Sequence, residues 1–306
     1  MKQELFWTVN IFSVAAMLTL GSSRVAGATV DLYDFEGNYN DTSGFGAPLN
    51  MTPTATGTAP TFANEVAPRV DTNFFGNTSL RINSSNSFTW VTPLANTKLE
   101  LQKFTVQAWI KPSTNNETGT IFSYVPRQAG ADGRGYIFNL SGGKLQFQYG
   151  RSIDNTFDVT TANTVLQSGV WYHVAVAFEW PCCGSNTNAV GEKFFINGAV
   201  DYFATPTYNP DARMDYSDGG ASFGPNPKAA FIGGFHNANN TVPDAQQDMI
   251  IMLANGTLLD RVKIDDQAYG SYSIGSQAAP LDYFVVPESS VACLLGLAVI
   301  ALRRRR

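Results

Sequence analysis

Cysteine and histidine are scarce in this sequence of 306 residues, which has three of the first and two of the second. Cys182 and Cys183 are adjacent and Cys293 lies far downstream, so they make no disulfide framework. His173 and His236 leave little room for a zinc centre or a Ser-His-Asp triad. His173 stands in an apolar run, where we expect a half-buried side chain bonded to backbone or to a neighbouring loop.

Basic residues are outnumbered by acidic ones. The chain has 20 Lys and Arg against 25 Asp and Glu, and residues 29–286 alone hold 14 basic and 23 acidic residues, a net charge of −9. A nucleic-acid partner needs Lys and Arg concentrated on one face to neutralise its phosphates. The charge balance therefore argues against nucleic acid and is compatible with polysaccharide or calcium.

The sequence also has no run of paired carboxylates of the kind that hydrolyses glycosidic bonds. Glycosidases place two Asp or Glu side chains on either side of the scissile bond. Glu179 and Glu192 are isolated, and the adjacent Asp265 and Asp266 would face opposite ways in a strand. We therefore predict a non-enzymatic protein, with a divergent polysaccharide-degrading enzyme as the alternative.

A short apolar run opens the chain. Residues 1–28 combine Lys2, an apolar stretch over 9–20 and the small residues Ala26-Gly27-Ala28. This order of features is typical of a secretory signal helix. It predicts that the mature chain begins at Thr29.

From residue 29 onward the sequence is a series of short strand-like runs. Runs rich in Val, Ile, Phe, Tyr and Thr are separated by Gly, Asn, Ser, Pro and Asp, which is typical of an all-β domain. In FTVQAWIK, residues 104–111, every second side chain is apolar and points to one face. Trp109 falls on the other face, so we expect a loop to cover the back of that strand in a two-sheet sandwich.

Two tight turns organise the middle of the chain. Gly142-Gly143 and Asn197-Gly198 each separate two alternating runs, and Asn-Gly supplies the positive φ angles of a type I′ hairpin turn. Residues 206–227 have no strand pattern and are predicted to form a long surface loop. Residues 29–280 contain no interdomain linker and no internal repeat, so we predict a single domain.

The order of the motifs in residues 29–280 resembles that of laminin G-like domains, which belong to the concanavalin A-like jelly-roll class. The matching segments are LYDFEGNYNDTSG, FFGNTSLRINSSNSFTWV, FTVQAWIKPS, SGVWYHVAVAF, EKFFINGAV, FIGGF and GTLLDRVKIDDQAYG. The resemblance implies an all-β sandwich of two antiparallel sheets. It does not identify a ligand, because one fold hosts many functions.

The same resemblance implies calcium as a possible cofactor. Asp41, in the first turn, and Asp260, in the last strand, match the family pattern, and first and last strands often lie side by side in such sandwiches. Ca²⁺ needs six to eight oxygen ligands, so these two carboxylates would be part of a larger set. The alternative is that Asp41 caps its own turn and Asp260 is a surface charge. A weaker candidate is formed by Asp211, Asp215 and Asp218.

Aromatic side chains offer possible platforms for sugar rings. The candidates are Trp90, Tyr124, Tyr149, Tyr208 and Tyr216. With 12% aromatic residues in the chain, most of these rings must belong to the core, so no single one is singled out.

The last segment, residues 281–306, ends in an apolar run and four arginines. The apolar run over 291–302 is shorter than the ~20 residues of a membrane-spanning helix. Arg303, Arg304, Arg305 and Arg306 would stay on the cytoplasmic side. With Pro287 and Glu288, this segment resembles PEP-CTERM sorting tails. The resemblance implies a C-terminal hydrophobic helix held in the inner membrane and processed by an exosortase-type enzyme, with a permanent anchor as the alternative.

These features together predict an exported, non-enzymatic protein of the cell surface or extracellular matrix. We expect its work to be adhesion or carbohydrate binding, with exopolysaccharide, another glycan or a matrix component as the partner. A purely structural matrix component without a specific ligand is a further alternative.

Overall fold

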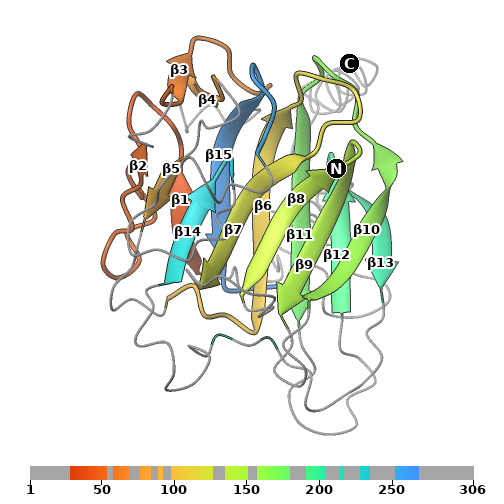
Figure 1. Cartoon of the computed structure of the whole chain (residues 1–306). Helices are drawn as coiled ribbons and strands as arrows, with labels where there is room; N and C mark the ends of the chain where they lie inside the picture. The colour runs from red at the N-terminus through yellow and green to blue at the C-terminus, as the bar shows by residue number, and fades with distance from the viewer. Residues whose placement is uncertain are drawn as a thin grey trace, which may run out of the picture.

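The computed structural model describes the residues of the sandwich, and the two ends of the chain are not among the described residues. The described residues are 28–53, 58–68, 76–83, 89–91, 98–126, 135–150, 157–179, 191–204, 214, 216, 228–234 and 252–268. Two antiparallel sheets lie face to face, as Figure 1 shows. The predicted all-β sandwich is therefore confirmed.

Sheet A has eight strands. In spatial order they are β13 (Ala199–Ala204), β12 (Gly191–Ile196), β11 (Tyr172–Glu179), β6 (Lys103–Lys111), β15 (Leu258–Asp265), β4 (Ser79–Arg81) and β3 (Thr61–Ala63), and β1 (Thr29–Tyr33) pairs with β15. Sheet B has seven strands. They are β10 (Phe157–Val165), β9 (Lys144–Gly150), β8 (Tyr136–Ser141), β7 (Gly119–Pro126), β14 (Lys228–Ile232), β5 (Thr89–Val91) and β2 (Thr52–Pro53).

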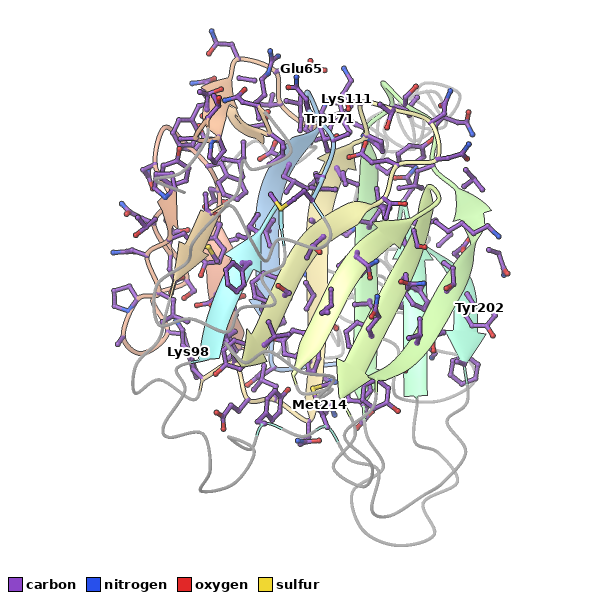
Figure 2. All side chains as sticks on the ribbon, viewed as in Figure 1. Glu65, Lys98, Lys111, Trp171, Tyr202 and Met214 are labelled. Atoms are coloured by element: carbon purple, nitrogen blue, oxygen red, sulfur yellow. The ribbon has the colours of Figure 1, made fainter. Side chains whose placement is uncertain are left out.

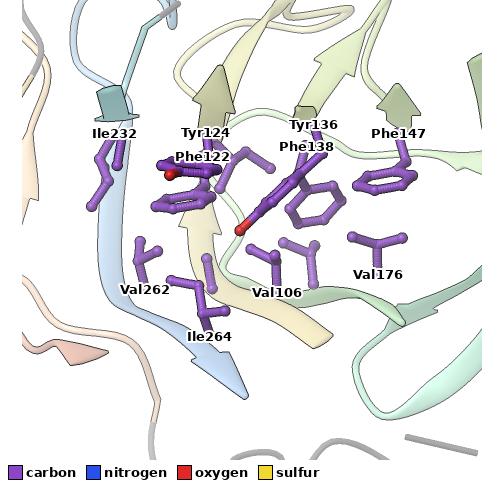
Figure 3. Packing of buried hydrophobic residues seen from close by; sticks show 14 of the residues in the cluster. Val106, Phe122, Tyr124, Tyr136, Phe138, Phe147, Val176, Ile232, Val262 and Ile264 are labelled. Carbon is purple, nitrogen blue, oxygen red and sulfur yellow. The ribbon is translucent and has the colours of Figure 1, made fainter. Parts of the chain in front are cut away.

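The core lies between the sheets and is rich in aromatic rings. Figure 3 shows Phe122, Tyr136 and Phe147 of sheet B packing toward Val106 and Val176 of sheet A. Strand alternation explains this arrangement, because residues at every second position of a strand face the same side. The core therefore takes one apolar face from each sheet, as the pattern in residues 104–111 predicts.

The two predicted hairpin turns are confirmed by backbone geometry. Gly142 and Gly143 have φ angles of 58° and 80° between β8 and β9, and Asn197 and Gly198 have 51° and 76° between β12 and β13. Consecutive positive φ angles are those of a type I′ turn, whose twist suits the flanking strands. These turns fix which side chains of each hairpin face outward.

The first and last strands lie side by side, as expected. β1 pairs with the second half of β15, and Tyr33 lies opposite Val262. β15 bulges between Asp260 and Lys263, where Arg261 has a φ angle of 49°. The bulge divides β15, so that its first half pairs with β4 and its second half with β1.

The outer face of sheet A is covered, as the position of Trp109 predicts. The loop after β3 crosses it, and the Ala67 amide donates to Asp260 Oδ2 at 3.0 Å. The segment after β15 covers another part, where Thr105 donates to the Gln267 carbonyl at 2.6 Å and Ala268 packs with Phe195. Both faces of β6 are consequently buried.

Some sequence predictions differ from the structure or lie outside its described residues. β10 was not expected, and within the predicted surface loop 206–227 Met214 and Tyr216 are buried. The signal segment, the sorting motif at Pro287, Glu288 and Arg303–Arg306, the three cysteines, His236, and Asp211, Asp215 and Asp218 lie outside the described residues. Within the part of the chain that the structure describes, no helix has the length and apolar character to span a membrane.

Candidate functional site

A row of uncharged polar side chains crosses the outer face of sheet B. It consists of Asn139 of β8, Gln146 and Gln148 of β9, and Thr161 of β10, and is here called the amide ladder. Gln148 Nε2 donates to Gln146 Oε1 at 2.8 Å, and Asn139 Nδ2 donates to the same oxygen at 3.1 Å. Gln146 Nε2 donates to Thr161 Oγ1 at 3.1 Å. The ladder thus spans three neighbouring strands.

Alternation along the hairpin explains why these groups face outward. Phe138 and Phe147 belong to the core and lie opposite each other, so Asn139 and Gln146 at the next positions face the other side. Gln146, Gln148 and Thr161 are half-buried, whereas Asn139 is fully buried. The ladder therefore has a closed end on β8 and a more accessible end on β9 and β10.

The accessible end keeps hydrogen-bonding capacity. An amide side chain carries two donors and one acceptor, and a hydroxyl can both donate and accept. Among the described residues, Gln148 Oε1 accepts no hydrogen bond, and Thr161 uses its oxygen as an acceptor but does not donate its proton. Val159 lies opposite Gln148 and is 54% exposed, which adds an apolar surface beside these groups.

Three of the five possible aromatic platforms belong to the core, as expected for most of these rings. Tyr124, Tyr149 and Tyr216 are buried in the core, where they pack against other rings. The side chains of Trp90 and Tyr208 lie outside the described part of the chain. The strand alternation places Tyr149 on the core face of β9, opposite the ladder glutamines.

Asp41 anchors the loop after β1. Its Oδ1 accepts from the amides of Ser43 at 2.9 Å and Leu32 at 3.2 Å, and its Oδ2 accepts from the Leu49 amide at 3.1 Å and from Lys98 Nζ at 2.7 Å. The bond from the Ser43 amide shows that Asp41 caps its own turn, which was the alternative to calcium binding. Burial alone would raise the pKa of Asp41, but hydrogen bonds from Lys98 and Ser43 lower it below its ordinary value.

Asp260 lies away from Asp41. It is fully buried opposite Trp109 and accepts from the Ala67 amide, so it is not a surface charge. Figure 2 shows Lys98, the partner of Asp41, at the opposite end of the sandwich from Lys111, which follows Trp109 closely in β6. The two predicted ligands therefore have different partners at different places.

A calcium ion does not fit the groups around Asp41. Four donors, one of them an ammonium group, already point at its two oxygens, and Ca²⁺ would require oxygen ligands in their place. Within the described residues, no three His, Cys, Asp or Glu side chains are grouped so that they could hold a metal. Calcium binding by Asp41 and Asp260 stays a prediction that this geometry does not support.

Asp31 is a carboxylate of this region that the sequence analysis did not single out. It is fully buried in β1, and Lys98 Nζ lies 2.5 Å from its Oδ1. The sequence could have indicated this burial. Asp31 and Tyr33 are two positions apart in a strand-like run, so their side chains face the same side. Its partner Lys98 is distant in sequence and could not be deduced.

The residues considered for catalysis do not form an acid–base pair. Glu192 lies opposite Phe178, so Glu179, the next residue along β11, faces the other side of sheet A. His173 is 1% exposed, and its Nε2 lies 3.1 Å from Gln107 Oε1, so it is more buried than predicted and contacts a neighbouring strand. Gln107 Nε2 in turn donates to Asp265 at 2.8 Å. This network joins β11, β6 and β15.

A comparison with models of protein families identifies the superfamily of this chain. The model described as the concanavalin A-like lectin/glucanases superfamily matches residues 72–235, which is more than half of the chain. This chain belongs to that superfamily. A search of curated proteins finds no match to this chain. Membership in the superfamily agrees with the laminin G-like resemblance of the sequence.

Several solved structures of binding domains are similar to this sandwich. The Botulinum Neurotoxin Type G Receptor Binding Domain has a TM-score of 0.47 and 12% identity, covering 80% of this chain and 49% of that one. The binding domain of Paraclostridial Mosquitocidal Protein 1 has a TM-score of 0.47 and 14% identity, covering 80% and 50%. The Ruminococcus gnavus IT-sialidase CBM40 bound to alpha2,3 sialyllactose has a TM-score of 0.44 and 13% identity, covering 63% and 92%. This chain spans about half the length of the two toxin domains.

Proposed function

We propose that this chain is an exported, non-enzymatic protein of the cell surface or extracellular matrix that binds glycans through the amide ladder. The observation that carries the proposal is the row Asn139, Gln146, Gln148 and Thr161 on the outer face of sheet B. Membership in a superfamily named for lectins and glucanases is compatible with this reading.

The chemistry of the ladder favours an uncharged, hydroxyl-rich ligand. Sugar hydroxyls donate and accept, so they match the open Gln148 Oε1 and the Thr161 hydroxyl proton. The ladder contains no ionised group, and Val159 beside it can contact the apolar face of a sugar ring. Fixing the amides to one another reduces the entropy that they lose on binding. A neutral stretch of exopolysaccharide is therefore the proposed partner.

Export and sorting are part of the proposal and are supported by sequence alone. Residues 1–28 would direct export, and residues 281–306 would hold the protein in the inner membrane until an exosortase-type enzyme processes the tail at Pro287-Glu288. Mass spectrometry of the protein recovered from the cell surface tests this step. We expect a C-terminus upstream of Arg303–Arg306, and a surface form that keeps all four arginines would contradict tail processing.

Glycan binding is tested with the purified chain on a glycan array, followed by calorimetric titration of the glycans that bind. We expect Gln146→Ala and Gln148→Ala to weaken binding about fivefold each, since the loss of one net hydrogen bond is worth about 1 kcal/mol. Gln167→Ala is the matched control, because Gln167 is exposed in the turn after β10 and outside the ladder. Binding to no glycan, or equal binding by all these variants, would overturn the proposal.

A further inference from the structure

Three ionisable side chains meet inside the sandwich beside β1. Lys98 Nζ lies 2.5 Å from Asp31 Oδ1 and 2.7 Å from Asp41 Oδ2. The side chains are almost fully buried, with exposed fractions of 6% for Lys98, 0% for Asp31 and 1% for Asp41. An amine and two carboxyl groups are therefore held in contact, with almost no access for water.

The contact between Lys98 and Asp31 is an ion pair that lacks good hydrogen-bond geometry. Neither oxygen of Asp31 has a hydrogen-bond partner among the described residues, although Nζ lies so close to one of them. Asp41, in contrast, accepts a hydrogen bond from the same nitrogen. The carbonyls of Val30 and Phe45, at 3.2 Å and 3.4 Å, help to fix Nζ in place. The nitrogen is thus positioned at the carboxyl group of Asp31, with a proton acceptor beside it.

The two carboxyl groups differ in their protonation. Burial raises the pKa of Asp31 to about 8, against the lowering effects of its close polar contact and charge interaction with Lys98, so burial favours the neutral acid at this position. The pKa of Asp41 is lowered by its hydrogen bonds, so this group is ionised. A neutral carboxylic acid is the form that an amine can attack, and a neighbouring carboxylate can serve as the general base.

We propose that Lys98 and Asp31 join in an intramolecular isopeptide bond, with Asp41 as the proton carrier. The Lys98 ammonium group first gives one proton to Asp41, and the resulting amine attacks Asp31 Cγ, so that a bond forms between Nζ and Cγ. Asp41 passes this proton to the departing hydroxyl of Asp31, which leaves as water, and takes the second proton from Nζ, which it later releases to solvent. The product is an amide and one water molecule, and no oxidant or other reactant is needed.

The fold supplies the conditions for this reaction. Holding Nζ against the carboxyl group of Asp31 replaces an encounter between separate molecules, and such proximity lowers the entropic part of the barrier to amide formation. Burial excludes the water that would favour the ions. The cross-link would tie β1 to the segment that leads into β6, at the centre of sheet A. Because the described residues include no cysteine, this bond would be the only covalent cross-link among them.

Mass spectrometry of the denatured full chain tests the proposal directly. We expect an intact mass lower by one water than the sequence predicts, with both chain ends located by peptide mapping. Trypsin should not cleave after the acylated Lys98, so the peptide that ends at Arg69 should be recovered joined to residues 82–103. Lys103, whose Nζ lies 3.2 Å from Glu179, is the internal control and should be cleaved normally.

Two variants assign the bond to its atoms. Lys98→Arg keeps the positive charge but cannot form the amide, and Asp41→Asn keeps the size but cannot carry the proton; we expect the unmodified mass for both. A wild-type chain of unmodified mass, with separate peptides ending at Arg69 and Lys98, would show an ordinary ion pair and overturn the proposal. Loss of water from Lys98→Arg would overturn the assignment to Lys98.

Discussion

Replacing Tyr136 by Phe should make the protein more stable. Tyr136 is fully buried on β8, and its hydroxyl has no hydrogen-bond partner among the described residues. Figure 3 shows this hydroxyl directed into the core, toward the strands of sheet A. Burial raises the pKa of Tyr136 well above its ordinary value, so the group stays neutral and carries a hydroxyl proton that is not used.

The size of the gain follows from the cost of an unsatisfied polar group. Burying a hydroxyl without a partner costs about 1–3 kcal/mol. Removing the oxygen also removes its van der Waals contacts and leaves a gap smaller than a water molecule. This loss of contacts offsets part of the increase in stability. We expect a net increase of about 1 kcal/mol in the free energy of unfolding, or a rise in Tm of about 2–4 °C for a domain of this size.

Tyr33→Phe is the matched control, with the opposite sign. Tyr33 is equally buried, but its hydroxyl donates to the Leu49 carbonyl at 3.0 Å. Removing this donor leaves the carbonyl unpaired and should cost about 1 kcal/mol. Urea unfolding followed by tryptophan fluorescence measures both variants against the wild type. A loss of stability in Tyr136→Phe as large as that in Tyr33→Phe would refute the reasoning.

Three further predictions concern the backbone, the sandwich edge and acid. Gly135→Ala should destabilise by more than about 2 kcal/mol in urea unfolding, because φ is +69° and a Cβ would lie 2.0 Å from the Tyr124 carbonyl oxygen; Gly169→Ala, with φ of +74° and open space, should cost less. The amides of Asn163 and Thr164 donate to Asp201 across the two sheet edges at 2.7 Å and 3.1 Å. Asp201→Ala should therefore lower the free energy of unfolding by about 1 kcal/mol and speed hydrogen exchange at these two amides. Unchanged exchange would contradict this. Because the folded-state pKa of Asp41 lies below its ordinary 3.8, its contribution is present above that pH and is lost as pH falls, so Asp41→Asn should flatten the acid limb of a stability–pH profile; an equally steep limb would contradict it.

Much of the fold could be predicted from the sequence because strand alternation is a local property. The pattern in residues 104–111 predicted both the core face of β6 and the covered outer face under Trp109. β10 escaped notice because its apolar positions do not mark a core face: Val159 and Val165 are exposed, and the residues between them are mostly Thr, Ala and Asn. An edge strand with one partner needs little apolar surface, so its sequence resembles a loop.

In the candidate sites, too, features set by local strand alternation could be predicted, whereas contacts between residues distant in sequence could not. The outward orientation of Gln146 and Gln148 follows from alternation and the Gly142-Gly143 turn, although the sequence did not show that Thr161 would complete the ladder. The contact of Asp31 with Lys98 joins residues 67 positions apart in sequence, so only the folded chain reveals it. Tyr149, one of the possible platforms, lies in the core because β9 alternates and its neighbours Gln146 and Gln148 face outward.

NMR titration of the side-chain amides tests glycan binding at the ladder most directly. The NH₂ resonances of Gln146, Gln148 and Asn139 can be assigned through single Gln→Glu and Asn→Asp variants and followed while a glycan from the array is added. We expect these resonances to shift in a saturable way, while that of Gln167 stays in place. Saturable shifts confined to residues away from the outer face of sheet B would contradict the proposed site.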